Sequence, residues 1–341
     1  MKVFLEDCIM QEGIEATAGS KMLRGFESPF NATVVERLLE KGHTIAGRVA
    51  MDEFGIVPVT GSNIADEAIK VATDGACVLC NDALGKYRRI VAAGMTEDSC
   101  YIHPTYGTVS RHGLIPTVSS MDQIGVLCKD VEEGFALLDH IAGHDPKDGA
   151  MFPDDTGFIA NSSAPVPKTI RVGIPGSFMG NMSFGRFRAI PMQLVHSDVY
   201  QQVMYILTCA EISNNISRYD GIKFGHRAEE FKGVNELYVK SRMEGFGLDT
   251  KMVAIMGAMV LSQDFYTPYY EKAMKIRRLI KESLLFDTYD IILLHPGMEP
   301  IAPLAGLPSV SFSSGGQGIQ LIANVGQENL LLSAWKGMNQ V

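Results

Sequence analysis

Apolar residues recur along the chain with two spacings, one typical of helices and one typical of strands. Asn31 can cap a helix whose apolar positions recur every three or four residues until Gly42, and residues 44–50 then read as a strand. Asp130, with Glu133 three residues later, forms a capping box for another helix. The pattern predicts helices and strands in alternation.

The second half of the chain continues this alternation. Residues 144–168 are rich in Asp, Pro, Gly and Ser, which is typical of a surface excursion, and they form the best internal boundary. Beyond them the pattern predicts helices at 197–217, 249–263, 269–286 and 328–336, and strands at 170–174, 290–294 and 319–323. Because the intervals between strands can hold crossover helices, we expect an α/β protein. Its mixed or largely parallel sheet should be covered by helices on both faces, in one domain spanning 1–341 with a possible subdivision near 144–168.

Composition narrows the class of protein. Hydrophobic residues make up 46% of the 341 positions and charged residues 20%, as in folded globular proteins. The longest strongly apolar stretch, 253–261, is too short to span a membrane, and the first thirteen residues do not resemble a secretory signal, so we expect a cytoplasmic protein. The net charge of −9 and the lack of a basic run argue against direct nucleic-acid binding.

Cysteine and histidine spacing gives no metal or redox motif. Cys77 and Cys80 are separated by two residues, but both lie in an apolar run and no second pair follows, which favours buried structural thiols. No His, Asp or Glu group has the spacing of a metal site. We therefore expect neither a metal nor another cofactor.

Several distinctive blocks follow one another along nearly the whole chain. They are Thr17–Leu23, Ser28–Val35, Met51–Phe54, Pro104–Gly107, Val109–Arg111, Ser119–Gly125, Ile141–Pro146, Ser213–Asn215, Arg218–Gly221, Gly225–Arg227, Glu244–Gly247 and Lys275–Arg277. In this order they resemble the amidase signature family, and within it the glutaminase A subunits of tRNA-dependent amidotransferases. The family implies a mixed sheet covered by helices, here without the N-terminal helical segment that the family has.

The resemblance also implies a catalytic set of a serine nucleophile, a second serine that relays the proton, and a lysine base. At the lysine position this chain has Glu6, within the block Leu5–Ile9. Ser62 stands at the relay position, and the family's spacing then places Lys86 where the nucleophile should be. No serine occurs between Ser62 and Ser99, so shifting the alignment cannot restore the nucleophile.

The family's substrate pocket is partly retained. Matching substrate-binding positions are occupied by Asp122, Gln123, His226 and Arg277. The segment that holds the family's carboxylate for the glutamine α-amino group is skipped near the C-terminal end. A remnant pocket around Arg277 could still bind an anion.

Two interpretations of the altered residues compete. In the first, Glu6 and Lys86 meet across Ser62 as an ion pair that replaces the catalytic set; in the second, Lys86 points to solvent. Cys8, two residues beyond Glu6, could act as a substitute thiol nucleophile with Glu6 or His295 as base, although core packing is the usual role of such a cysteine.

The sequence leaves three hypotheses for function. The favoured one is an amidase-fold protein without Ser-Ser-Lys hydrolysis that acts as a ligand-binding or assembly subunit. The second is an active amidase or glutamine amidotransferase subunit with a rewired site, and the third is a scaffold for partner subunits. We expect a homo-oligomer or a second protein subunit, with a small amide or carboxylate as the ligand.

Overall fold

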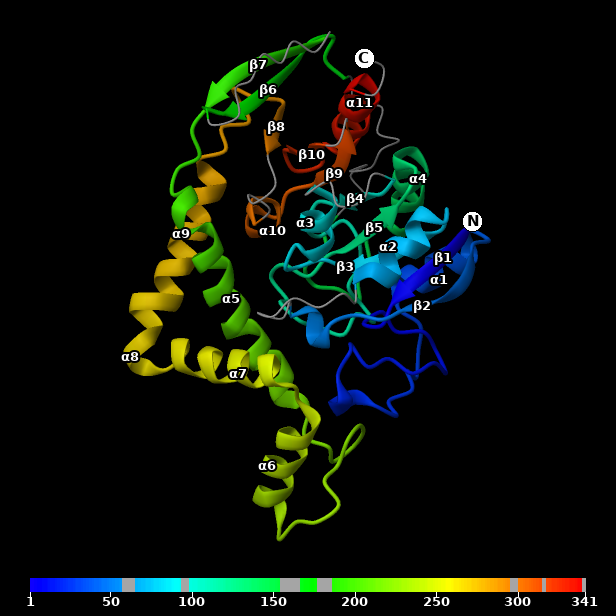
Figure 1. Ribbon diagram of the computed structural model, residues 1–341, viewed down its shortest axis with the longest axis vertical. Coiled ribbons are helices and arrows are strands. Elements are labelled where there is room, and N and C mark those ends of the chain that lie inside the picture. Colours follow the sequence, from blue (N-terminus) through cyan, green and yellow to red (C-terminus); the bar gives the residue numbers. More distant parts are fainter. Residues whose placement is uncertain are drawn as a thin grey trace.

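A ten-stranded mixed sheet forms the centre of the computed structural model, which describes residues 1–56, 65–92, 98–153, 166–176, 186–294, 300–314 and 317–338 (Figure 1). The strand order is β2-β1-β3-β5-β4-β9-β10-β8-β6-β7. The strands are β1 (Lys2–Glu6), β2 (Thr44–Val49), β3 (Cys77–Asn81), β4 (Cys100–His103), β5 (Ile124–Cys128), β6 (Ile170–Pro175), β7 (Phe187–Met192), β8 (Ile291–Leu294), β9 (Ser309–Ser314) and β10 (Gln317–Ala323). Parallel pairs lie at the two edges and antiparallel pairs in the middle, so the predicted mixed sheet is confirmed.

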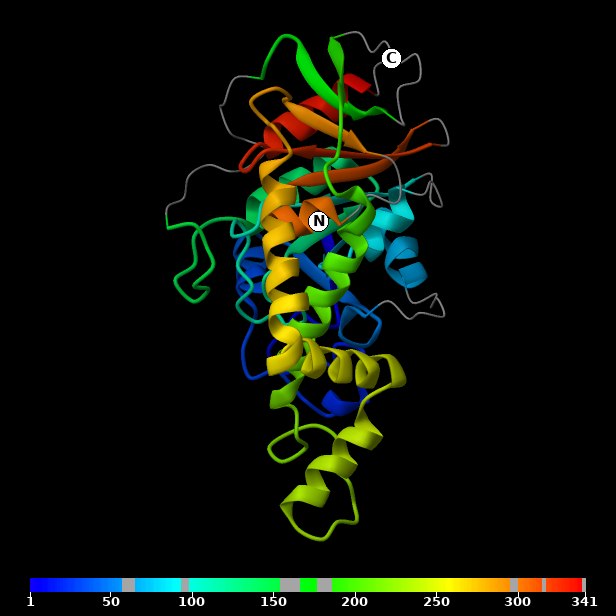
Figure 2. The same cartoon turned by 90° about the vertical axis from the view of Figure 1, so that its left-hand side faces the viewer.

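Helices cover both faces of this sheet. They are α1 (Thr33–Glu40), α2 (Ala65–Thr73), α3 (Lys86–Ala92), α4 (Val131–Ile141), α5 (Tyr200–Asn215), α6 (Val234–Gly245), α7 (Leu248–Val260), α8 (Gln263–Phe265), α9 (Lys272–Glu282), α10 (Ile301–Ala305) and α11 (Glu328–Met338). Helices α2 and α3 lie on one side of the strands, and α1 and α4 on the other (Figure 2). The alternation of side chains along a strand explains this arrangement, because Cys77 and Leu79 of β3 join the core beneath α4, whereas Val78 and Cys80 join a second cluster beneath α2 and α3.

Several predicted elements agree with the structure in detail. The Asp130 carboxylate accepts a hydrogen bond from the backbone N–H of Glu133 (3.0 Å), which is one of the two hydrogen bonds of the predicted capping box. The helix predicted at 197–217 is α5 extended by 3-10 turns at Ser197–Val199 and Ile216–Arg218. The helix predicted at 269–286 is shorter, because a π-helical segment, Tyr266–Glu271, precedes α9.

A group of helices extends away from the sheet. Helices α5 and α9 lead down from the β6–β8 side to α7 and α6, which form the lower end of the molecule in Figure 1. Helix α7 packs closely on α5, where Gly257 lies against the backbone of Cys209. No helix among the described residues is long and apolar enough to cross a membrane.

Candidate functional site

The turn before α3 fixes the direction of the first side chains of that helix. The Asp82 carboxylate accepts hydrogen bonds from the backbone N–H groups of Tyr87 (3.0 Å) and Arg88 (3.1 Å), in the manner of a helix cap. The Arg88 guanidinium donates to the backbone oxygen of Asp82 (2.6 Å) and is completely buried. These hydrogen bonds between the Asp82 turn and the start of α3 orient Lys86 and Tyr87 toward the end of β1.

Glu6, the last residue of β1, is buried and fully engaged. One carboxylate oxygen accepts from the Tyr87 hydroxyl (2.8 Å) and the other from the backbone N–H of Asn81 (2.8 Å). Burial raises the pKa of Glu6 to about 7, although these hydrogen bonds and the nearby charge of Lys86 act in the opposite direction. Glu6 therefore exchanges its proton near neutral pH.

Lys86 forms an ion pair with Asp52. Its Nζ lies 2.5 Å from Oδ2 of Asp52, and the two side chains are only 10% and 3% exposed. The ammonium also lies 5.6 Å from the centre of the Tyr87 ring. The ammonium of Lys86 is therefore enclosed together with the carboxylate that compensates its charge.

The predicted ion pair between Glu6 and Lys86 is therefore wrong. The two residues do come near each other, since the charge of Lys86 influences the pKa of Glu6, but the acceptor for the ammonium is Asp52. The carboxylate of Glu6 instead accepts from Tyr87 and Asn81. The alternative of a solvent-exposed Lys86 is wrong as well, because the residue is 8% exposed.

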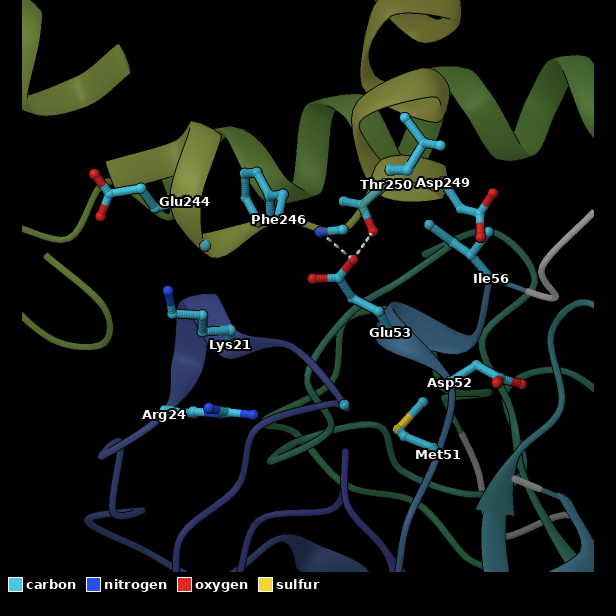
Figure 3. A pocket seen from close by; sticks show the side chains of 14 residues that line it. Lys21, Arg24, Met51, Asp52, Glu53, Ile56, Glu244, Phe246, Asp249 and Thr250 are labelled. Atoms are coloured by element: carbon cyan, nitrogen blue, oxygen red, sulfur yellow. Dashed lines mark hydrogen bonds between the residues drawn. The ribbon is translucent and has the colours of Figure 1, made fainter. Parts of the chain in front are cut away.

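Asp52 also lies in the wall of a pocket of about 470 Å³ (Figure 3). The pocket is formed by the segment around Lys21–Leu23, the Met51–Ile56 segment and the junction of α6 with α7. Its lining residues are Gly19, Lys21, Arg24, Met51, Asp52, Glu53, Ile56, Glu244, Gly245, Phe246, Gly247, Leu248, Asp249 and Thr250. Lys86 therefore contacts, through Asp52, the wall of a space that can hold a small molecule.

Glu53 joins the three walls of this pocket. One of its carboxylate oxygens accepts from the Ser20 hydroxyl (2.5 Å), and the other accepts from the backbone N–H of Gly247 (2.9 Å) and from the Thr250 hydroxyl (Figure 3). Gly247 caps α7, so a negative charge here also meets the positive end of that helix. Glu53 is a fixed structural acceptor rather than an available base.

Positive charge on one wall is a main chemical feature of the described pocket lining. Lys21 and Arg24 are exposed cations with no acidic side chain within ion-pair distance among the described residues. The described part of the lining contains no serine, cysteine or histidine, and the one hydroxyl in that part, Thr250, donates to Glu53. The described walls can therefore hold an anionic group but contain no free nucleophile.

The predicted substrate residues are occupied by internal contacts. Asp122 is buried and accepts from the Asn81 amide (2.8 Å), the Thr117 hydroxyl (2.6 Å) and two backbone N–H groups. Gln123 donates its amide to the backbone oxygen of Pro104 (2.5 Å). Both residues shape the loop between β4 and β5.

His226 and Arg277 lie at separate places. His226 is 2.9 Å from the Glu244 carboxylate beside the 470 Å³ pocket, whereas Arg277 lines a different pocket of about 370 Å³. The Arg277 guanidinium donates to the backbone oxygen of Leu304 (2.7 Å) and to Ser120 (2.7 and 2.9 Å). Asp122 lines a third pocket of about 210 Å³, so these four residues do not share one of these pockets.

Of the remaining candidate residues, the structure describes Cys8 but not Ser62 or His295. Ser62 and His295 fall in the segments 57–64 and 295–299, which are not described. Cys8 is buried, with its sulfur 3.5 Å from Glu6, and burial together with that carboxylate raises its thiol pKa. A raised pKa suppresses the thiolate, so core packing is the better interpretation of Cys8. The described residues contain no cluster of three or more His, Cys, Asp or Glu able to hold a metal.

The sequence-based reasoning missed the partners Asp52, Tyr87 and Asn81. In the sequence, the pair Asp52–Glu53 within the Met51–Phe54 block is more typical of helix-surface or scaffold residues than of an acid/base couple. A possible signal was the new lysine at position 86, because a buried cation needs an acid. Nothing in the spacing of the residues identified which acid would supply it.

Comparisons with known proteins identify the family. A model of the family described as Amidase matches residues 1–68 and 102–314. The A subunit of glutamyl-tRNA(Gln) amidotransferase from Cellvibrio japonicus is 32% identical over 395 aligned residues, which cover 96% of this chain and 81% of that protein. The corresponding protein of Caldanaerobacter subterraneus is 34% identical, over 85% of this chain and 67% of its own length. The chain belongs to the amidase family.

Solved structures share the fold. The A subunit of glutamyl-tRNA(Gln) amidotransferase from Thermotoga maritima superimposes with a TM-score of 0.70 at 23% identity, covering 97% of this chain and 81% of that one. The Kluyveromyces lactis allophanate hydrolase gives a TM-score of 0.74 at 15% identity, over all of this chain and 62% of its own. The predicted amidase-signature architecture is confirmed.

Proposed function

We propose that this chain is an amidase-family protein without Ser-Ser-Lys hydrolysis that acts as a ligand-binding or assembly subunit. The carrying observation is the buried ion pair between Lys86, at the position expected for the nucleophile, and Asp52. A protonated ammonium has no lone pair with which to attack a carbonyl carbon. The residue at the position of the nucleophile therefore has a structural role.

The position of the base supports the same proposal. Glu6 has a pKa of about 7 and is held by Tyr87 and Asn81, so it is an acceptor within a closed network. A lysine base works by alternating between neutral and cationic forms, and a carboxylate cannot provide that electrostatic environment for a serine hydroxyl. The positions of the base and of the nucleophile are therefore both occupied by residues of different chemistry, Glu6 and Lys86.

The extent of the family match supports the proposal independently. The match stops at residue 68 and resumes at residue 102. The intervening residues include β3, the Asp82 turn and α3, which together place Asn81, Lys86 and Tyr87. The chain thus departs from the family pattern in the segment that carries the altered position, while the scaffold on either side of it matches.

A test of hydrolysis is direct. The purified protein is incubated with glutamine or asparagine and ammonia release is measured, with an active amidase as positive control and Ser62→Ala as matched variant. We expect no release above buffer, and no difference between the wild type and Ser62→Ala. Ammonia release that Ser62→Ala abolishes would overturn the proposal in favour of an active enzyme with a rewired site.

The ligand is proposed to be a small amide or carboxylate in the 470 Å³ pocket. Lys21 and Arg24 supply the positive charge for a carboxylate, and Asp249 and Glu244 lie on the opposite wall. Thermal shifts with glutamine, asparagine and glutamate test this, comparing the wild type with Lys21→Ala/Arg24→Ala and with the exposed control Lys41→Ala. Loss of the shift only in the double variant supports the site, and an equal shift in all three proteins removes it.

The assembly part of the proposal concerns a homo-oligomer or a second protein subunit. Its support is that the matched curated relatives are described as A subunits of an amidotransferase. Light scattering after size exclusion measures the mass of the purified chain, and affinity purification from its own source organism measures bound partners. A monomer that retains no stoichiometric second chain would contradict assembly and leave ligand binding as the function.

A further inference from the structure

Three cysteines from neighbouring strands form a row at one end of the sheet. Cys100 of β4 is directly opposite Cys128 of β5 in antiparallel register. Cys77 of β3 lies one step beyond the Val78–Leu127 pair, which places it opposite Cys128 on the other side. All three side chains belong to the core beneath α4, so Cys128 is the middle thiol of this cysteine row.

Two sulfur atoms of the cysteine row lie little farther apart than the sulfurs of a disulfide bond. The sulfurs of Cys100 and Cys128 are 3.2 Å apart, and a disulfide bond measures about 2.05 Å, so closure needs a shift of only about 1 Å. Opposite residues of antiparallel strands have Cα atoms about 4.5–5.5 Å apart, within the range that disulfides span. Cys77 is opposite Cys128 on the other side of β5, and the interaction of the two thiols raises the pKa of Cys77. Either neighbour of Cys128 can therefore become its partner.

The surroundings of the cysteine row favour protonated, reduced thiols. The neighbouring thiol of Cys128, followed by burial, raises the pKa of Cys77. The hydrogen bond with Cys100, followed by burial, raises the pKa of Cys128, so few reactive thiolates are present at rest. Gly134 of α4 lies over Cys128, and a Cβ there would overlap the sulfur. Cys77 and Cys100 are 2% exposed and Cys128 is 1% exposed, whereas the side chain of Lys129, which directly follows Cys128, is 51% exposed.

We propose that the cysteine row is an oxidation site at which a peroxide joins Cys100 and Cys128, with Cys77 able to exchange into the bond. One thiolate attacks the peroxide, forming a sulfenic acid and releasing the first water; the second thiol attacks that sulfur, the S–S bond forms and the second water leaves. The two thiols lose two hydrogens and two electrons in total, which reduce the peroxide. Attack of Cys77 on the sulfur of Cys128 then releases Cys100 without net oxidation.

The exchange would link different strands. A bond between Cys100 and Cys128 ties β4 to β5, whereas a bond between Cys77 and Cys128 ties β5 to β3. Strand β3 ends at Asn81, whose backbone N–H holds Glu6. The second bond would therefore constrain the strand that orders the candidate site.

The test uses the full-length wild-type protein treated with hydrogen peroxide. We expect the intact mass to fall by about 2 Da, for the two hydrogens lost, and non-reducing peptide mapping to place the bond at Cys128, joined to Cys100 or Cys77. Circular dichroism confirms that the treated protein stays folded. Six free thiols in folded, peroxide-treated protein, or a bond that excludes Cys128, would overturn the proposal.

Variants separate the roles within the row. Cys128→Ser should abolish the loss of mass, Cys100→Ser should leave only the bond between Cys77 and Cys128, and Cys77→Ser only the bond between Cys100 and Cys128. Cys209→Ser, on α5 and outside the row, should behave as the wild type does. If a serine variant does not fold, the alanine variant at the same position replaces it. A disulfide that persists in folded Cys128→Ser would exclude a row centred on Cys128.

Discussion

Lys86 and Asp52 form a buried ion pair, with Nζ 2.5 Å from Oδ2, between the first turn of α3 and the segment that follows β2. Removing one member leaves the other charge without compensation in a buried place, which costs about 3–5 kcal/mol in comparable proteins. We expect Lys86→Met to lower the free energy of unfolding by about 3 kcal/mol, measured by urea denaturation.

The matched variant for this pair removes both charges. Lys86→Met/Asp52→Asn should recover most of the lost stability, because no buried charge then lacks a partner. A double variant whose loss equals the sum of the two single losses would show that the pair contributes no coupling energy.

Glu6 should make stability depend on pH. Its pKa is about 7 in the folded protein against 4.5 for a free side chain, so the folded state holds the proton more tightly. The stabilisation that protonated Glu6 gives to the folded state is fully present below pH 4.5. It is lost as the pH rises through 7, and the free energy of unfolding falls by about 3 kcal/mol in total. We expect Glu6→Gln to remove this decline, measured as the difference in unfolding free energy between pH 5 and pH 8.

Two controls define the effect of Glu6. Glu328 is also buried with a pKa of about 7, so it should make its own contribution to the fall in stability between pH 5 and pH 8. Glu6→Gln should therefore retain the part of this fall that Glu328 causes. Glu328→Gln should in turn reduce the fall by a similar amount. The exposed residue Glu40 should have no influence, and Glu40→Gln should follow the wild type. Identical pH profiles for Glu6→Gln and wild type would mean that Glu6 is not buried in the folded protein.

The sequence predicted the frame of the fold because the frame depends on local patterns. The capping box of Asp130 and Glu133 involves neighbours along the chain, and the two faces of β3 follow from alternation. Lys86 pairs with Asp52, which lies 34 positions earlier in the sequence, because the turn at Asp82 directs the lysine side chain toward it. The periodicity of apolar residues contains no information about such a distant pair. The π-helical segment Tyr266–Glu271 was missed because apolar spacing does not reveal an extra residue within a turn.

Glu53 should control the order of the α6–α7 junction. Its carboxylate accepts from Ser20, Gly247 and Thr250, and a hydrogen bond to a charged group contributes about 1.5–3 kcal/mol. Because Glu53 is half-buried, water replaces part of these bonds in a variant, so the expected loss is close to that of one bond. We expect Glu53→Ala to lower stability by about 2 kcal/mol and to speed amide hydrogen exchange in the first turn of α7. Asp249→Asn, in the same pocket wall, should change exchange much less; equal effects would assign the order of α7 to its dipole alone.

Gly257 should set the distance between α5 and α7. A Cβ at this position would overlap the backbone oxygen of Cys209 and the side chain of Ser213. Alanine favours a helix over glycine by about 1 kcal/mol, but the overlap is with backbone, which cannot rotate away, and overpacking costs about 1–3 kcal/mol. We expect the second effect to prevail, so that Gly257→Ala lowers the unfolding free energy by about 1 kcal/mol and speeds exchange in both helices. Ala258→Gly, at an exposed position of the same helix, should lose about 1 kcal/mol through propensity, without faster exchange in α5. A Gly257→Ala variant more stable than the wild type would show that α5 and α7 have room between them for a methyl group.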